Sequence, residues 1–399
     1  MDDEPLILSS LKRLLARAGF PRTETFERCL LALARLDAPG DAPELIILDL
    51  NMPGMDGPEF IRNLMERKFA GGLVLMSGEG ERVLQSVQRL ARAHGIADAG
   101  FLTKPIESSL LGSVVRSWIS KTDAVARPRG PEYGAERLRE AIDGGELELH
   151  YQPKVSVSNG AFIGVEALVR WRHPSDGLIF PDQFIATAES NGLIGRLTRA
   201  VTHGAVEQLR RLTDSGHEIG IALNVSMDNL SSLDFAASVS DAAHAAGVSN
   251  SSVTLEVTES RLMMDLRAPL ETLTRLRLMR FALSIDDFGT GHSSLAQLRD
   301  IPFDELKIDR TFVHGAATDS TVRAIYSASL LLAKQLGMRI VAEGVEDRSD
   351  WDFLRQTGCN AAQGYFIGRP IPADRLEEWL PAWQARVRDE LGIDPTAMS

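Results

Sequence analysis

The chain has 399 residues, more than one ordinary hydrophobic core requires, so two domains are expected. Hydrophobic residues make up 44% and charged residues 25%, as in water-soluble globular proteins. A formal net charge of -12 excludes a surface that binds a nucleic acid backbone along its whole length, but it is compatible with a local basic cleft for a small phosphate ligand.

Cysteine usage and hydropathy exclude two further classes of protein. Cys29 and Cys359 are the only cysteines, and their separation fits neither a disulfide framework nor a metal motif. No apolar run approaches the roughly twenty residues that cross a membrane, and the N-terminus is acidic. We therefore expect a cytoplasmic protein with no membrane partner, in which both cysteines are buried as small apolar side chains.

The first part of the chain, residues 1–121, alternates short apolar runs with amphipathic segments. Strands are predicted at 44–50, 72–78 and 99–104, and helices at 7–20, 26–36, 57–68, 80–95 and 108–120. Strands separated by helices of this length form a parallel sheet covered on both faces, which is a doubly wound α/β fold. In such sheets the chemistry lies beyond the carboxyl ends of the strands.

Three polar residues fall at these strand ends: Asp49, Ser77 and Lys104. Asp2 and Asp3 at the start of the chain add two more carboxylates. Carboxylates, a hydroxyl and an ammonium together can bind a divalent cation and stabilise a phosphoryl group on a carboxylate nucleophile.

The segments DDEP, LDLNMPGMDG and FLTKP resemble the receiver domain of bacterial response regulators, and the resemblance covers the whole of this domain. It implies that Asp49 is the phosphoacceptor, and that a sensor histidine kinase is a partner. It also implies one Mg²⁺, bound by Asp2, Asp3 and the backbone of Asn51. A degenerate receiver that serves only for docking is the alternative.

The same resemblance assigns the remaining polar positions and raises a question about the start of the chain. Ser77 and Lys104 are implied to contact the phosphoryl group, and Phe101 is implied to be the switch aromatic. Receivers have a buried apolar strand before the acid pair, whereas only Met1 precedes Asp2 here. Losing a central strand would expose apolar surface and unpaired backbone, so we expect upstream codons to encode this strand.

The second domain is expected at residues 135–385, between a linker at 122–134 and a C-terminal tail at 386–399. Apolar runs predict eight strands, at 147–155, 162–171, 218–226, 253–260, 281–289, 305–313, 339–346 and 361–368. Most of these runs are followed by a helical stretch. Eight strands with helices over about 250 residues match a TIM-like (β/α)8 barrel.

Polar residues near the strand ends of such a barrel meet at one mouth. They are Glu166, Asn224, Glu256, Asp286, Asp287, Lys307, Glu343 and Gln363, and five of these eight are acidic. So many oxygen ligands repel one another unless divalent cations are bound, and oxygen favours Mg²⁺ or Mn²⁺ over Zn²⁺. Two such ions, bridged by Asp286, can activate water and clamp a phosphodiester. Taken alone, Glu256 is as compatible with a structural role.

The segments YQPK, VEALVRW, NVS, EVTE, DDFGTG, KID, EGVE and QGY resemble, in this order, the EAL family of cyclic di-GMP phosphodiesterases, from about residue 135 to about residue 383. The resemblance implies hydrolysis of cyclic di-GMP to linear pGpG with two Mg²⁺ or Mn²⁺ ions. Glu166, Asn224, Glu256 and Asp286 are implied to hold one ion, and Asp286 with Asp287 the second.

Further roles follow from the same resemblance. Lys307 is implied to lie beside the attacking water, with Glu343 and Gln363 helping to hold water or metal. Glu259 is implied to anchor the loop after Asp287.

Substrate contacts are implied at Gln152, at Arg170, whose planar fork suits phosphate, and at Asp309 for a guanine edge. His292 stands where the family usually has tyrosine, and we expect it to pack within its loop. Structural roles are also expected for His150.

We expect structural roles for His173 and Trp171 as well.

The leading hypothesis is a phosphodiesterase tuned by receiver phosphorylation, and a homo-oligomer formed through the barrel is expected. A dinucleotide sensor without catalysis and a signalling scaffold are the alternatives; retention of every metal carboxylate and of the lysine favours the enzyme. The sequence contains no GGDEF-like cyclase segment, and no nucleic acid polymer is expected as a partner.

Overall fold

The computed structural model describes residues 1–17, 20, 22–38, 42–78, 84, 87–88, 90–91, 96–104, 106, 111–112, 114–115, 118, 133–258, 267–289, 298 and 301–393. Outside these ranges lie Glu259, His292, residues 122–132 of the expected linker and most of the expected helices at 80–95 and 108–120. The chain divides into two compact units, Met1–Pro131 and Glu132–Ser399. No helix within the described ranges combines the length and apolar character that crossing a membrane requires.

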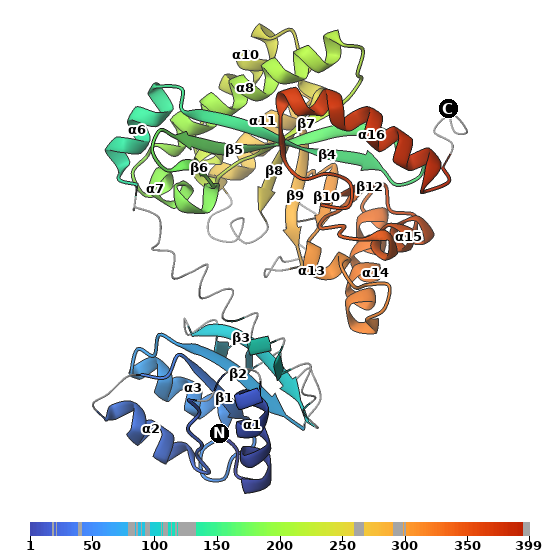
Figure 1. Ribbon diagram of the computed structural model, residues 1–399. Helices are drawn as coiled ribbons and strands as arrows, with labels where there is room; N and C mark the ends of the chain where they lie inside the picture. Colours follow the sequence, from blue (N-terminus) through green and yellow to red (C-terminus); the bar gives the residue numbers. More distant parts are fainter. Residues whose placement is uncertain are drawn as a thin grey trace. The chain divides into compact units, whose positions relative to one another are not determined.

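The first unit contains a parallel sheet in the order β1-β2-β3 (Figure 1). Its elements are α1 (Pro5–Arg17), α2 (Cys29–Asp37), β1 (Leu45–Asp49), α3 (Gly57–Glu66), β2 (Gly72–Ser77) and β3 (Ala97–Thr103). Every residue of β2 is buried, as expected for a middle strand covered on both faces. The predicted doubly wound α/β class is therefore confirmed.

Met1 lies beside the edge of β1. Its amino group donates to the Ile47 carbonyl at 2.7 Å, and its own carbonyl accepts from the Asp49 amide at 3.0 Å. These two bonds have the pattern of a parallel ladder. They place Asp2 and Asp3 next to the carboxyl end of β1.

The second unit contains a closed barrel of eight strands, in the order β4-β5-β7-β8-β9-β10-β11-β12 and back to β4 (Figure 1). The strands are β4 (Leu147–Ser156), β5 (Phe162–His173), β7 (Gly220–Asn224), β8 (Val253–Thr258), β9 (Ala282–Phe288), β10 (Glu305–Ile308), β11 (Arg339–Ala342) and β12 (Ala361–Gln363). The TIM-like class is confirmed, with one difference. Strand β4 runs antiparallel to both of its neighbours, because the connection 157–161 is too short for a crossover helix.

Helices cover the outside of this barrel. They are α6 (Ala135–Asp143), α7 (Ile185–Ser190), α8 (Ile194–Asp214), α9 (Met227–Leu230), α10 (Phe235–Ala245), α11 (Arg267–Leu278), α13 (Arg310–Val313), α14 (Ser320–Gln335), α15 (Arg348–Thr357) and α16 (Leu376–Asp389). Two short strands, β6 (Gly177–Ile179) and β13 (Ile371–Pro372), extend the sheet at β5 and β4. Single 3-10 turns are η1 (Pro181–Gln183), η2 (Asn250–Ser252) and η4 (Ala373–Arg375).

The expected strand at 305–313 is corrected by the structure. Strand β10 ends at Ile308, and the following residues form helix α13 because Asp309 caps it: Asp309 Oδ1 accepts a hydrogen bond from the Thr311 amide at 2.9 Å. The expected strand at 361–368 is likewise shorter, since β12 ends at Gln363.

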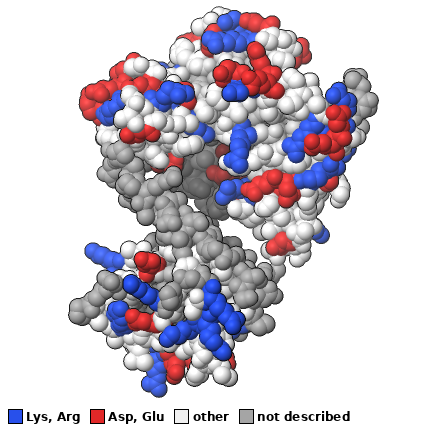
Figure 2. All heavy atoms as spheres, viewed as in Figure 1, with Lys and Arg blue, Asp and Glu red and all other residues white. Residues whose placement is uncertain are grey.

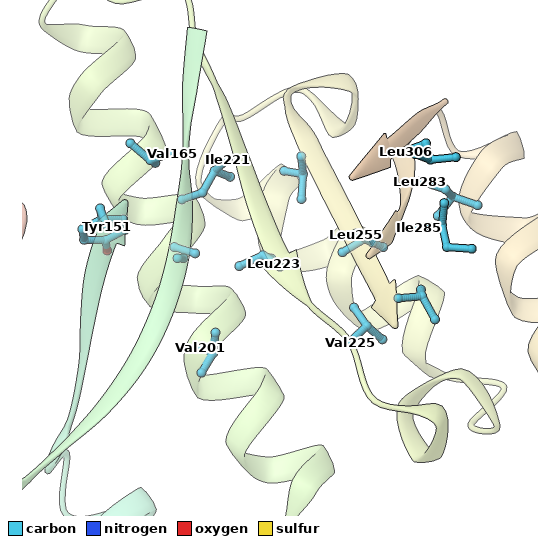
Figure 3. Close-up of a cluster of buried hydrophobic side chains, with 14 of the residues drawn as sticks. Tyr151, Val165, Val201, Ile221, Leu223, Val225, Leu255, Leu283, Ile285 and Leu306 are labelled. Atoms are coloured by element: carbon cyan, nitrogen blue, oxygen red, sulfur yellow. The ribbon is translucent and has the colours of Figure 1, made fainter. Parts of the chain in front are cut away.

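Alternation along the strands separates an apolar layer from a polar interior. Leu255, Leu283 and Leu306 are buried members of one hydrophobic cluster, which also includes Val201 of α8 (Figure 3). The residues that alternate with them are polar, such as Glu256 in β8. The barrel interior therefore carries charged groups, whereas the strand faces toward the helices supply the core.

Candidate active site

Asp286 and Asp287 are adjacent in β9, yet both carboxylates belong to one cluster. In a regular strand successive side chains point to opposite faces. Here the register between β9 and β10 shifts beside the two acids, and Asp287 has a φ of 55°, in the left-handed region. As a result, carboxylate oxygens of Asp286, Asp287 and Glu343 all lie within 4.8 Å of one another.

Lys307 of β10 lies at the centre of the acidic residues. Its Nζ is 2.7 Å from Glu256 Oε2, 2.7 Å from Glu343 Oε1, 3.2 Å from Asp286 Oδ1 and 3.5 Å from Glu166 Oε2. Burial by itself would lower the pKa of Lys307, but the surrounding carboxylates raise it well above its usual value. Lys307 therefore remains an ammonium that draws side chains from several strands together.

Glu166 is held in place by two side-chain amides. Asn224 Nδ2 donates to Glu166 Oε1 at 2.7 Å, and Gln363 Nε2 donates to Glu166 Oε2 at 2.7 Å. Gln363 Nε2 also donates to Gln152 Oε1 at 2.9 Å. Burial would raise the pKa of Glu166, but Lys307 and the two amide donors lower it, so Glu166 is ionised. Glu166 lies in the middle of β5, because β5 continues after Glu166 and pairs with β4 as an antiparallel hairpin.

Negative charge exceeds positive charge in this cluster. Four carboxylates contact the ammonium of Lys307, those of Glu166, Glu256, Asp286 and Glu343, and a fifth, Asp287, lies beside Asp286 and Glu343. Burial, reinforced by neighbouring carboxylates, raises the pKa of Glu256 well above its usual value, that of Glu343 to about 8 and that of Asp287 to about 6. The described residues thus leave a deficit of positive charge that two divalent cations would balance.

Oxygen atoms without a hydrogen-bond partner in the cluster agree with such cations. Glu256 Oε1 and Gln363 Oε1 are buried, and within the described part of the chain neither has a hydrogen-bond partner. Asn224 uses its amide nitrogen on Glu166, which leaves its Oδ1 for another contact. Carboxylate and amide oxygens suit Mg²⁺ or Mn²⁺, so the donor set fits the ions expected from the sequence.

A second layer of polar side chains inside the barrel consists of Lys154, Ser284 and Glu305, and it was not predicted from the sequence. We call it the lower layer, and we call Lys307 and the carboxylates around it the upper layer. Lys154 Nζ of β4 is 2.9 Å from Glu305 Oε1 and 3.8 Å from Glu256 Oε1. Ser284 Oγ donates to Glu305 Oε1 at 3.3 Å. The signal was present in the YQPK segment, where a lysine occupies the strand face that alternates with apolar positions. This ion pair supports Glu256 from the side away from Lys307.

The three expected substrate contacts have different surroundings. Gln152 is part of the amide pair beside Glu166. Arg170 of β5 is buried, and its guanidinium lies 4.9 Å from the ring centre of Phe180, a contact that could not be predicted from the sequence. Asp309 caps α13, so one of its oxygens is engaged within the chain. Arg170 Nε has no hydrogen-bond partner among the residues described.

The histidines near these strands make contacts of their own. His150 Nε2 lies 3.0 Å from Glu148 Oε1, and the His173 ring packs 5.3 Å from Trp171. Trp171 is buried and donates its Nε1 hydrogen to Glu146 at 2.8 Å. These contacts join neighbouring segments of the hairpin around β5.

The first unit has its own charged cluster at the carboxyl ends of its strands. Lys104 Nζ is 2.8 Å from Asp2 Oδ2 and 3.0 Å from Asp49 Oδ2. Carboxylate oxygens of Asp2, Asp3 and Asp49 lie within 4.8 Å of one another. Burial would lower the pKa of Lys104, but its bonds to Asp2 and Asp49 raise it. Two acids from the start of the chain therefore reach the acid that ends β1.

The other predicted residues of this unit lie at or near the same strands. Ser77 is the buried last residue of β2, and its carbonyl accepts from the Lys104 amide at 3.0 Å. Phe101 is half-buried on β3, and Asn51 is exposed two residues after β1. Asp49, Ser77 and Lys104 are thus brought to one edge of the sheet.

Comparison with known proteins assigns both units. Residues 135–370 match the family model described as EAL domain, and residues 1–116 match the response regulator receiver domain. Cyclic di-GMP phosphodiesterase RocR of Pseudomonas aeruginosa is 32% identical over 388 residues, which are 95% of this chain and 97% of RocR.

Two other relatives match a shorter part of the chain. The bifunctional diguanylate cyclase/cyclic di-GMP phosphodiesterase MucR of Pseudomonas aeruginosa is 46% identical over 240 residues, and cyclic di-GMP phosphodiesterase NbdA of the same organism is 43% identical over 250 residues. These matches cover 60% and 62% of this chain but about a third of each relative, 35% and 32%. A solved PaMucR phosphodiesterase in complex with c-di-GMP, 46% identical, has a TM-score of 0.58 over 60% of this chain and 98% of that one. The chain belongs to the EAL domain family and carries a response regulator receiver domain ahead of its EAL domain.

Proposed function

We propose that residues 135–385 hydrolyse cyclic di-GMP to linear pGpG with two Mg²⁺ or Mn²⁺ ions. The observation that carries the proposal is the buried Lys307, surrounded by carboxylates that exceed it in charge. The similarity to RocR, a cyclic di-GMP phosphodiesterase, supports the choice of substrate because it extends over nearly the whole chain.

In this proposal Glu166, Asn224, Glu256 and Asp286 hold one ion, and Asp286 with Asp287 holds the other. When bound, the two ions would lower the pKa of a water molecule and would supply positive charge for the phosphodiester oxygens. Asn224 Oδ1 and Glu256 Oε1 support these assignments, because neither accepts a hydrogen bond from the residues that the structure describes.

The proposed role of Lys307 is to orient the attacking water by donating a hydrogen bond to it. Its raised pKa argues against a role as a general base. Glu343, whose Oε1 lies 2.7 Å from Lys307 Nζ, is proposed to help hold that water or a metal ion. Gln363 keeps Glu166 oriented. Glu259 is proposed to anchor the loop that follows Asp287.

Substrate recognition is proposed to use Arg170 for a phosphate, supported by its unpaired Nε and by the aromatic face of Phe180 behind it. Gln152 is proposed to contact substrate beside Gln363. Asp309 would use the carboxylate oxygen that does not cap α13 for a guanine edge.

Residues 1–121 are proposed to act as a receiver that a sensor histidine kinase phosphorylates at Asp49. One Mg²⁺ would be held by Asp2, Asp3 and the backbone of Asn51, with Ser77 and Lys104 on the phosphoryl group and Phe101 as the switch aromatic. The ion pairs of Lys104 with Asp2 and Asp49 support the proposed role of Lys104, because a phosphoryl group on Asp49 would give the lysine a new anionic partner. Phosphorylation of the receiver is also proposed to tune hydrolysis. Self-association through the barrel is a further part of the proposal, and the exposed Leu331 of α14 supports it.

The test is to incubate purified protein with cyclic di-GMP and Mg²⁺ or Mn²⁺ and to identify products by chromatography. Wild type should release pGpG, and Glu166→Gln should lose at least about a hundredfold in rate because a metal-binding oxygen is lost. Glu218→Gln is the matched control, since Glu218 is an exposed acid just before the amino end of β7. Binding of the dinucleotide without hydrolysis would refute the enzyme and favour a sensor.

A further inference from the structure

Tyr133 belongs to the linker expected at 122–134, yet it is buried against the barrel unit. Only 7% of this residue is exposed. Its ring centre lies 4.6 Å from that of Trp171 and 5.2 Å from that of His173, both at the end of β5. Segments that join two domains are usually exposed and make few contacts. Burial of Tyr133 therefore fixes the point at which the chain enters the barrel unit.

The hydroxyl of Tyr133 reaches the turn between β5 and β6. It donates a hydrogen bond to Asp176 Oδ2 at 2.8 Å. Burial, together with this hydrogen bond, raises the pKa of Tyr133 to about 12, so the phenol keeps its proton at neutral pH and remains a donor. Asp176 Oδ1 accepts from Ser175 Oγ at 3.1 Å, which orients the carboxylate within the turn. Tyr133 thus contacts both the strand and the turn of the β5–β6 hairpin.

Trp171 is the residue on which Tyr133 packs, and several contacts hold its indole in one orientation. Besides the bond from its Nε1 to Glu146, its ring lies 5.9 Å from that of Phe184, nearly perpendicular to it. The Arg137 guanidinium of α6 lies 5.3 Å from the centre of the indole. Because protein interiors are close-packed, rotation of the indole cannot absorb a shift of Tyr133. The shift would move β5 instead.

The same hairpin carries the proposed phosphate contact. Arg170 directly precedes Trp171 in β5, and Phe180 directly follows Ile179, which pairs with Trp171 across the hairpin. The guanidinium of Arg170 lies over the ring of Phe180. Successive side chains of a strand point to opposite faces, so Arg170 and Trp171 share one backbone but not one environment. A displacement of β5 at Trp171 therefore moves Arg170 as well.

We propose that Tyr133 is a positioning residue that sets the affinity for cyclic di-GMP by fixing the hairpin that presents Arg170 and Phe180. It is also the point through which the receiver acts on that affinity, since residues 1–132 are joined to the barrel unit by the peptide bond before Tyr133. The match to the EAL domain begins at residue 135, so Tyr133 lies outside it. The substrate rests on the proposed function, whereas the anchoring of the hairpin does not.

Affinity and turnover are measured on the full-length protein, by calorimetric titration with cyclic di-GMP in Ca²⁺ and by steady-state kinetics in Mg²⁺. Tyr133→Ala should raise Kd and KM about tenfold, because a misplaced Arg170 loses part of a charge-assisted contact with phosphate, while kcat stays within about twofold. Tyr133→Phe keeps the ring and should raise KM only about threefold, through loss of one hydrogen bond.

Tyr326→Phe is the matched control. It removes the hydroxyl of another buried tyrosine, which lies 3.0 Å from Thr357 Oγ1 on the far side of helix α14 from the hairpin residues named above. Its Kd and KM should equal those of wild type. Asp176→Ala removes the acceptor of the Tyr133 hydroxyl and should raise KM as Tyr133→Phe does, and the two effects should not add in the double variant.

Anchoring of the hairpin is tested without substrate by hydrogen–deuterium exchange. Backbone amides of residues 169–180 should exchange faster in Tyr133→Ala than in wild type, and those of β8 should exchange at the same rate. Coupling is tested with beryllofluoride bound at Asp49 as a mimic of the phosphoryl group. It should change the Kd of wild type for cyclic di-GMP and change that of Tyr133→Ala much less.

Unchanged Kd and KM in Tyr133→Ala would overturn the positioning role, and so would an equal loss of affinity in Tyr326→Phe. A beryllofluoride response of the same size in wild type and Tyr133→Ala, or none in wild type, would overturn the role in coupling. Unchanged exchange of residues 169–180 in Tyr133→Ala would overturn the anchoring. Wild type that neither binds nor hydrolyses cyclic di-GMP would instead refute the proposed function, and faster exchange of the hairpin in Tyr133→Ala would still support the anchoring.

Discussion

Glu256 and Glu305 are two glutamates buried inside the same barrel with opposite pKa shifts. They are 1% and 4% exposed. Burial raises the pKa of Glu256 well above its usual value even though Lys307 lies 2.7 Å away. Burial acts on Glu305 in the same direction, but Lys154 at 2.9 Å outweighs it and lowers the pKa. We predict that replacing each by glutamine changes the stability of the metal-free protein in opposite directions.

The magnitudes follow from linkage between pKa and folding. A carboxylate whose pKa is raised on folding lowers the free energy of unfolding, by about 1.4 kcal/mol for each pKa unit at a pH where it is ionised. Glu256→Gln keeps the shape without the charge, and it should raise the free energy of unfolding by about 1 kcal/mol or more. Glu305→Gln leaves Lys154 with only the more distant Glu256, and it should lower that free energy by about 3 to 5 kcal/mol.

The pH dependence has a definite sign. Glu256 is protonated in both states below its unfolded pKa of about 4.3, so its unfavourable effect is absent there and grows as the pH rises toward its folded pKa. The advantage of Glu256→Gln should therefore widen as the pH rises above about 4.3, the unfolded pKa. The stabilisation by Glu305 is present above its unfolded pKa and is lost as the pH falls through its lowered folded pKa, so the deficit of Glu305→Gln should shrink in acid.

The assay is urea unfolding in EDTA, followed by tryptophan fluorescence, since every tryptophan except Trp118 lies in the barrel unit. Added Mg²⁺ should raise the midpoint of wild type more than that of Glu256→Gln, because binding to the folded state stabilises it. Equal destabilisation by Glu256→Gln and Glu305→Gln would refute the reasoning.

Two further predictions concern the residues around Lys307. Lys307→Met should lower turnover steeply while the affinity for cyclic di-GMP, measured in Ca²⁺, stays within a few-fold; lost affinity with preserved turnover would contradict its role at the water. Asp350 is buried and accepts hydrogen bonds from His314 Nδ1 at 2.9 Å and from the Glu346 amide at 3.0 Å, so it fixes the loop that carries Glu343. Asp350→Ala should reduce turnover about ten- to a hundredfold with little change in KM, and Asp350→Asn should restore part of it, as steady-state kinetics would show. Full activity of Asp350→Ala would exclude this positioning role.

The sequence predicted the order of strands and helices because apolar periodicity is local. It predicted the barrel class for the same reason, but not the direction of β4, since periodicity carries no information on strand direction. The connection 157–161 did carry that information: five residues cannot hold a crossover helix. Glu166 was placed at a strand end and lies mid-strand, because β5 continues beyond the barrel.

The placement of both the Asp286 and the Asp287 carboxylate beside Glu343 could not be predicted from the local sequence pattern. Strict alternation would send one of them into the layer between strand and helices. The register shift beside β10 and the left-handed backbone at Asp287 turn both toward Glu343. Such a backbone conformation costs about 1 kcal/mol or more for a residue with a side chain, and no neighbouring residue signals it. Strain of this kind is expected where function requires two adjacent ligands.

The charges inside the barrel support placing the proposed cations in one layer only. In the lower layer Lys154 and Glu305 balance each other, whereas in the upper layer Lys307 faces several carboxylates. Acidic and basic side chains are interspersed on the visible face of the barrel unit (Figure 2), whereas Lys307 and the carboxylates of Glu166, Glu256 and Asp286 are buried. Glu256 belongs to the upper layer but also faces Lys154, 3.8 Å away. Glu256, whose raised pKa opposes folding of the metal-free protein, is therefore also a residue that the proposed mechanism requires, which is the expected relation between a preorganised cation site and stability.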